Sequence, residues 1–135
     1  MFDLIAVEHD EAYVLENVKV IHAPITPNSI STQHGESGWY DSTALESLRG
    51  ESFDLLIVDG PPGAIGRTGL LSVPWLIRQC GCIMVDDTHR PAELELAALL
   101  EAMLINVERQ VLVEESEWGQ RMTTVLTRSE PFDHR

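Results

Sequence analysis

The sequence predicts an α/β fold, in which a mostly parallel β-sheet carries helices on both faces. Short apolar runs alternate with helical patterns along the 135 residues, and this alternation is typical of strands joined by right-handed crossovers. The last two predicted strands are separated by a short turn, so they should add an antiparallel hairpin. A chain of this length can bury one hydrophobic core, and we expect residues 1–135 to form a single domain.

The first half of the chain contains three predicted strands. Residues 4–7 and 18–23 are short apolar runs, and residues 12–16 leave room for about one helical turn between them. Residues 24–43 hold four serines, two glycines and two prolines, which predicts a long loop of the functional or mobile kind. Residues 53–58 form the clearest strand, and their continuous apolar character predicts burial on both faces.

The second half alternates helices with strands. Residues 69–79 are helix-like, with Pro74 in a first turn or at a kink. Residues 82–85 predict the next buried strand. Residues 91–104 predict a helix, because a proline suits its first position and leucines recur at helical spacing. Residues 107–114 and 122–128 predict the two strands of the C-terminal hairpin.

The net charge and the cysteine content of the chain limit the classes of partner and the cellular location that we expect. The chain has 22 acidic and 9 basic residues, a formal net charge of -13, which argues against nucleic acid and favours a small molecule. No apolar run approaches the ~20 residues of a membrane-spanning helix, and the N-terminus lacks the basic region of a signal peptide. We therefore expect no membrane partner and a cytoplasmic location. Cys80 and Cys82 are expected to be packing thiols, as in a reducing compartment.

Acidic residues follow several of the predicted strands, where ligands bind in open α/β sheets. Glu8 could accept both hydroxyls of a ribose, or it could be a solvated strand end. Asp59 precedes a stiff Gly-Pro-Pro-Gly turn and could face a ligand or cap that turn. Asp59, Asp86 and Asp87 together would suffice for a divalent cation such as Mg²⁺; the alternative is that Asp86 and Asp87 cap the following helix.

Three further side chains are candidates for substrate chemistry. His89 could act as a general base toward a substrate hydroxyl. Arg67 or Arg90 could hold a substrate carboxylate or phosphate. The alternative for each is an ordinary surface loop residue.

Several segments, taken in order, resemble the class I S-adenosylmethionine-dependent methyltransferases, particularly small-molecule O-methyltransferase-like members. The most specific segment is the strand that ends in Asp59-Gly60-Pro61-Pro62. The resemblance covers most of residues 2–128 and implies a Rossmann-like sheet and methyl transfer to a small-molecule acceptor. The matching segments are residues 5–10, 18–24, 39–40, 53–63 and 81–90.

The resemblance also implies roles for individual residues. Glu8 would bind the cofactor ribose with His9 beside it, and Ala23 and Pro24 would lie near the adenine. Asp59 would lie close to the methionine end of the cofactor and to the acceptor. In cation-dependent members, acids after the same two strands hold a metal, and Asp59, Asp86 and Asp87 fall in similar places.

The sequence departs from the family at its beginning. The family's first strand and glycine-rich turn would precede Leu4, and no Gly-x-Gly occurs before Gly35. That strand lies at the centre of the family's sheet, between the strands predicted at 4–7 and 53–58, so its absence would leave two sheet edges. Exposed edges promote association. The alternative expectation is therefore a truncated, catalytically inactive methyltransferase-like module that self-associates, most simply as a homo-oligomer, or binds a partner; a third is an acidic nucleotide-binding protein with other chemistry.

Overall fold

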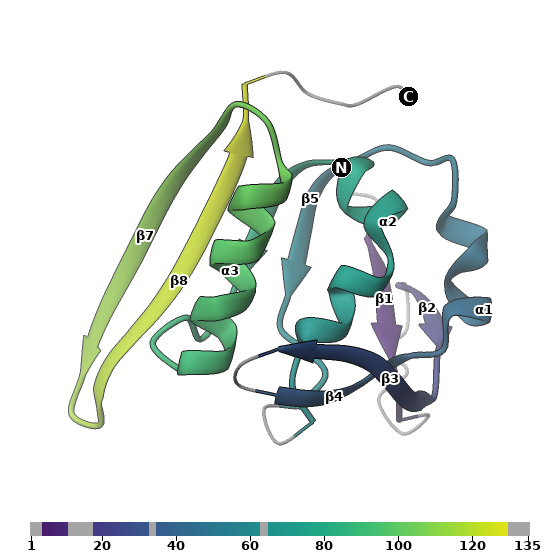
Figure 1. The fold of residues 1–135 in the computed structure, drawn as a ribbon, viewed down its shortest axis with the longest axis horizontal. Coiled ribbons are helices and arrows are strands. Elements are labelled where there is room, and N and C mark those ends of the chain that lie inside the picture. The colour runs from purple at the N-terminus through teal and green to yellow at the C-terminus, as the bar shows by residue number, and fades with distance from the viewer. Residues whose placement is uncertain (1–3, 11–17, 33–34, 63–64, 130–135) are drawn as a thin grey trace.

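The computed structural model of the chain describes residues 4–10, 18–32, 35–62 and 65–129. Figure 1 shows four strands at the start of the described chain, helices alternating with strands in its middle, and two long strands at its end. The elements are β1 (Ile5–Glu8), β2 (Lys19–His22), β3 (Ile25–Thr32), β4 (Gly35–Tyr40), α1 (Ser42–Leu45), η2 (Glu46–Leu48), β5 (Phe53–Val58), η3 (Thr68–Ser72), α2 (Pro74–Arg78), β6 (Cys80–Val85), α3 (Pro91–Met103), β7 (Val107–Ser116) and β8 (Gly119–Arg128).

The strands form three sheets. β1 and β2 are a parallel pair, β3 and β4 an antiparallel pair, and the remaining strands form a four-stranded sheet in the order β5-β6-β8-β7. β5 and β6 are parallel, whereas β8 runs antiparallel to both of its neighbours. The predictions of the α/β class and of a C-terminal antiparallel hairpin are confirmed. The prediction of one mostly parallel sheet is wrong for the described residues, because two of the three pairings in the four-stranded sheet are antiparallel.

The core lies between one face of the four-stranded sheet and the helices α2 and α3. Figure 1 shows both helices on the same side of this sheet, and α3 presents the leucine stripe that its sequence pattern predicts. This face of the sheet is largely apolar because it carries Leu56 and Val58 of β5, Ile83 and Val85 of β6 and Leu126 of β8, which alternate with residues on the opposite face. The buried residues at this interface include Val58, Ile83, Val85, Leu126, Leu76, Ile77, Leu96 and Leu100.

The opposite face of the sheet departs from the prediction. Residues 53–58 were expected to be buried on both faces, but Leu55 is 44% and Ile57 is 55% exposed. Strand register places Leu55 beside Cys82 and Ile57 beside Met84, so these four side chains share one face, which we call the open face. The expectation of helices on both faces is wrong for the described residues, because their helices α2 and α3 pack on the other side.

The prediction of a loop over residues 24–43 is also wrong. Residues 25–40 form the β3–β4 hairpin, with Ile25 opposite Tyr40 and Thr26 opposite Trp39. The hairpin packs on η3, where a Cβ on Gly69 would overlap the side chain of Trp39. Tertiary packing of this buried tryptophan therefore stabilises strands whose composition is that of a loop.

The predicted helix over 69–79 is split in two. Pro74 is the first residue of α2 and follows Val73, which has the non-helical dihedrals φ -122° and ψ 62°. Proline disfavours helical geometry in the preceding residue and lacks an amide hydrogen, so η3 ends before it. The helical turn expected over residues 12–16 lies outside the described residues. None of the described helices is long and apolar enough to span a membrane.

Cys80 and Cys82 are free thiols, as expected. Cys80 is fully buried and its Sγ donates a hydrogen bond to the carbonyl of Leu76 at 3.1 Å. Burial raises the pKa of Cys80 to about 12, which keeps it protonated and unreactive at neutral pH. Cys82 lies on the open face and is partly exposed.

Candidate functional site

Glu8 is the last residue of β1 and has an unusual environment. Its Oε2 atom is buried and has no hydrogen-bond partner among the described residues. Its carbonyl accepts a hydrogen bond from the amide of Ala23 at 2.8 Å, and Ala23 is fully buried. A buried carboxylate oxygen without a donor costs free energy, so this arrangement fits a ligand that brings hydroxyl donors to the end of β1.

Tyr40 connects the ends of β1 and β5. A Cβ on Gly60 would overlap the Tyr40 hydroxyl, so a glycine is needed where the turn after Asp59 approaches the ring. Burial raises the pKa of Tyr40 to about 12; the charges of Glu8 and Asp59 also raise it, against the opposing charge of Arg67. The two acids are therefore close to one phenol. No sequence pattern predicted a role for Tyr40.

Arg67 is buried and forms hydrogen bonds to the turns that follow β5 and β6. Its Nε donates to the carbonyl of Pro61 at 3.1 Å, and its Nη1 donates at 3.3 Å to the carbonyl of Asp86 and to Oδ2 of Asp87. Its Nη2 lies 3.6 Å from Oδ1 of Asp59. The surface role considered for Arg67 from sequence is wrong, since this guanidinium links the turns that follow β5 and β6.

Asp87 accepts from three arginines and has a positive φ of 59°, a conformation that aspartate tolerates better than most residues. Oδ2 accepts from Arg67 at 3.3 Å and from Arg90 at 3.0 Å, and Oδ1 accepts from Arg121 at 3.3 Å. Neither it nor Asp86 caps α3, whose N-cap is Arg90 with no side-chain hydrogen bond. Asp87 is thus held in a network of ion pairs.

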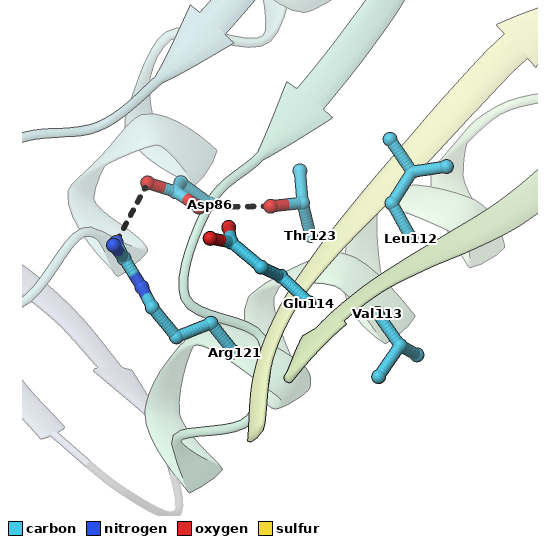
Figure 2. A pocket seen from close by; sticks show the side chains of 6 residues that line it. All are labelled: Asp86, Leu112, Val113, Glu114, Arg121 and Thr123. Atoms are coloured by element: carbon cyan, nitrogen blue, oxygen red, sulfur yellow. Dashed lines mark hydrogen bonds and ion pairs between the residues drawn. The ribbon is translucent and has the colours of Figure 1, made fainter. Parts of the chain in front are cut away.

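Asp86 lines a pocket of about 340 Å³ between its own turn and the β7–β8 hairpin. Figure 2 shows Arg121 and Thr123 pointing from β8 toward Asp86, with Glu114 beside them on β7. The Thr123 hydroxyl donates to Oδ1 of Asp86 at 2.8 Å, and Arg121 lies 3.8 Å from Oδ2. The pocket is lined by Asp86, Leu112, Val113, Glu114, Arg121 and Thr123.

The three acids that were predicted to hold a divalent cation do converge. One ligand atom from each of Asp59, Asp86 and Asp87 lies within 4.8 Å of the other two. However, Arg67 and Arg121 already pair with them, so a cation would have to compete with guanidinium groups inside the cluster. These residues fit Mg²⁺ poorly, and metal binding stays a prediction.

The two histidines proposed from sequence lie in different settings. His89 is exposed, and its Nδ1 accepts a hydrogen bond from the amide of Met122 at 3.2 Å. A neutral ring with this bond carries its proton on Nε2, so no lone pair is left for a substrate proton in this conformation. The general-base role of His89 stays a prediction. The carbonyl of His9 lies 3.2 Å from Nε2 of His22, and the exposed Pro24 follows Ala23 directly.

The contributions of Asp59 and Asp87 to the free energy of unfolding should change in opposite directions with pH. Burial raises the pKa of Asp59 and the charge of Asp86 adds to this, with Arg67 opposing. Burial alone would raise the pKa of Asp87, but the hydrogen bond from Arg121 and the charges of Arg90 and Arg67 hold it below its usual range. A carboxyl group whose pKa is lower in the folded state than in the unfolded state stabilises the fold at pH values above the unfolded-state pKa. This stabilisation is lost as the pH falls through the folded-state pKa. A carboxyl group whose pKa is raised in the folded state destabilises the fold at neutral pH, and this effect disappears at low pH.

We expect Asp87→Asn to lower the free energy of unfolding at pH 7 by about 2 kcal/mol, because charge-assisted hydrogen bonds are lost. The loss should shrink below the ordinary aspartate pKa of 3.8. Asp59→Asn should instead raise stability slightly at pH 7, with no effect at low pH. Urea unfolding at pH 7, 5 and 3 measures both variants, and equal effects of the same sign would contradict this assignment.

Comparison with known proteins identifies no relative: no family model, no curated protein and no solved structure matches this chain.

Proposed function

We propose that this chain binds S-adenosylmethionine in a Rossmann-like site and transfers the methyl group to a small-molecule acceptor. The observation that carries the proposal is the buried, unpaired Oε2 atom of Glu8 at the end of β1. Acids at such strand ends bind the two ribose hydroxyls of a nucleotide. Those hydroxyls would supply the donors that the described residues do not.

The strand order supports the same proposal. β1 and β2 form one parallel pair, and β5 begins the four-stranded sheet. The methyltransferase resemblance places one further strand between β1 and β5. Both are edge strands among the described residues, β1 of the β1-β2 sheet and β5 of the four-stranded sheet.

The chemistry proposed for the site uses Glu8 at the end of β1, Asp59 directly after β5, and Arg67. A bound S-adenosylmethionine would supply an electrophilic methyl group. Glu8 would orient the nucleoside, and Asp59 would accept a proton from the acceptor hydroxyl, a reaction favoured by its raised pKa. Arg67 would hold the Asp59 turn in place through Pro61. Alignment of the acceptor would then supply much of the rate enhancement.

Calorimetric titration with S-adenosylhomocysteine tests the proposal. The native chain should bind, and Glu8→Gln should weaken binding about 10- to 100-fold, because a charge-assisted hydrogen bond contributes about 1.5–3 kcal/mol. The same substitution should not lower the free energy of unfolding, since no described residue donates a hydrogen bond to the buried Oε2 atom.

Glu51→Gln is the matched control, because Glu51 is exposed and lies before β5, at the other end of that strand from Asp59. It should leave binding unchanged. No binding by the folded native chain, or equal binding by native chain and Glu8→Gln, would count against the proposal.

A second candidate function has its own supporting observation. β1 and β5 are each paired on one side only among the described strands, and β5 exposes Leu55 and Ile57 on the open face. A catalytically inactive, methyltransferase-like module could self-associate or bind a partner through these two edges. Two results together would favour this function: the folded native chain does not bind S-adenosylhomocysteine, and the Leu55→Glu substitution abolishes its self-association or its binding to a partner.

A further inference from the structure

The outermost strand of the four-stranded sheet, β7, has an unpaired edge. It pairs with β8 along its whole length, from Val107 opposite Arg128 to Ser116 opposite Gly119, and with no other described strand. Figure 1 shows it as the last strand of the sheet, on the side away from β5. In the part of the chain that the structure describes, no strand pairs with the amide and carbonyl groups of its other edge.

β7 has one of the features that protect natural sheet edges but lacks others. Such edges are often short, or carry proline or charged side chains, lysine above all. The charged residues of β7, which are Glu108, Arg109, Glu114 and Glu115, lie on either side of an uncharged segment. β7 has ten residues, Val-Glu-Arg-Gln-Val-Leu-Val-Glu-Glu-Ser, with no lysine, proline or glycine. Its three central residues, Val111, Leu112 and Val113, are consecutive exposed hydrophobics. Because side chains alternate along a strand, this run places apolar groups on both faces of the edge.

We propose that β7 is a homodimer interface, in which a second copy of the chain pairs antiparallel with it about a two-fold axis at Leu112. This proposal is independent of the function proposed above. The pairing would join the two four-stranded sheets into one continuous sheet, and a two-fold axis makes the contact self-complementary. The free backbone groups of the edge would then be paired.

Charge complementarity selects this register. With Leu112 opposite Leu112 of the second copy, Arg109 faces Glu115 and Val111 faces Val113, each pair occurring twice. Directly opposed side chains lie on the same face of a sheet and interact. Both copies carry a formal net charge of -13, so they repel at long range and need a contact at which opposite charges meet.

The neighbouring symmetric registers are worse. Centring the axis on Val111 places Glu108 opposite Glu114, and like charges directly opposed are destabilising. Centring it on Val113 places Val111 opposite Glu115, which covers an apolar side chain with a charged one. Only the register centred on Leu112 matches both the apolar residues and the charges.

The same register also covers the two most exposed large hydrophobic side chains of the described chain. Trp118, in the turn between β7 and β8, is 90% exposed, and Ile105, just before β7, is 78% exposed. When the register is continued past the ends of β7, the turn of one copy lies opposite Asn106 of the other. Trp118 would then lie beside Ile105 of the second copy.

The test is the mass of the chain measured by light scattering and sedimentation over a range of concentrations. The native chain should form dimers, with blue-shifted Trp118 fluorescence at high concentration. Arg109→Glu and Glu115→Arg should each weaken dimerisation about tenfold, since each converts two attractive pairs into repulsive ones. The double variant Arg109→Glu/Glu115→Arg should restore the native affinity within about threefold.

This rescue is specific for pairing between copies. Within one chain, positions 109 and 115 are six residues apart on a strand, about 20 Å, too far for direct coupling. Arg109 also pairs with Glu101 of α3 at 3.5 Å within the chain, so circular dichroism and thermal melting must show that each variant folds. A double variant that dimerises no better than the single variants would overturn the register.

Two leucines of equal exposure provide a matched pair of variants. Leu112 and Leu55 are both 44% exposed and lie on the two outermost strands of the same sheet. Leu112→Glu should abolish dimerisation, because it opposes two carboxylates at the axis, whereas Leu55→Glu should leave it unchanged. A native chain that is monomeric throughout, or a dimer lost with Leu55→Glu but kept with Leu112→Glu, would overturn the proposal.

Discussion

Replacing Arg67 with methionine is expected to lower the free energy of unfolding by about 3 kcal/mol, because breaking a buried ion pair leaves polar groups unpaired. Methionine keeps most of the aliphatic volume but donates no hydrogen bonds. The carbonyls of Pro61 and Asp86 would lose the donors at 3.1 and 3.3 Å, and Asp87 would lose one of its three arginines. Urea unfolding at low protein concentration measures the loss.

Two further variants, Arg67→Lys and Arg49→Met, test why Arg67→Met should be destabilising. Lysine keeps the charge but cannot reproduce the guanidinium fork, so Arg67→Lys should be intermediate. Arg49 is exposed, pairs with Glu46 and stacks on Trp75 at 4.5 Å, so its loss should matter far less than that of Arg67. Equal losses for Arg67→Met and Arg49→Met would show that Arg67 does not hold the two strand ends together.

Leu100→Ala should destabilise the chain by about 2–5 kcal/mol, the usual cost of removing a buried leucine side chain from a core. Leu100 lies on α3 and is fully buried in the cluster that contains Ile83 and Leu126 of the sheet. No described helix covers the open face, so this cluster is the main apolar contact between the sheet and α3. Chemical unfolding followed by far-ultraviolet circular dichroism checks the value.

Leu94→Ala is the control within the same helix. Leu94 is exposed, and alanine has the higher helix propensity, so the effect should stay within about 0.5 kcal/mol. A comparable loss at Leu94 would mean that the helix face opposite Leu100 is covered by another copy or another segment, and would contradict the described packing of α3.

Particular segments show how far sequence patterns reach. The strand over 53–58 and the helix beginning at Pro91 were placed correctly, because a continuous aliphatic run and a proline followed by spaced leucines have few alternative structures. Residues 25–40 were misassigned, because serine, asparagine and glycine predict a loop. Their pairing depends on the contact of Trp39 with Gly69, which is thirty residues away in the sequence.

The residues of the candidate site also fall into two groups, those that the sequence predicted and those that only the structure revealed. Glu8, Asp59, Asp86 and Asp87 were found from the sequence because each follows an apolar strand, and parallel strands bring such ends together. Tyr40 and the linking role of Arg67 were missed. Tyr40 ends a hairpin strand that was expected to be loop, and an arginine eight residues beyond Asp59 gives no local sign that it is buried.

By itself, the sequence determined the strand at 53–58, the helix beginning at Pro91, the C-terminal hairpin and the acids at the strand ends, since these depend on hydrophobic periodicity and short-range chemistry. Only the tertiary structure decided which face of the sheet is covered, which strand edges are free, and how Arg67 connects the acids. Those properties depend on contacts between residues far apart in the chain. The free β7 edge and the unpaired Oε2 atom of Glu8, each of which carries one of the two proposals, belong to this second group.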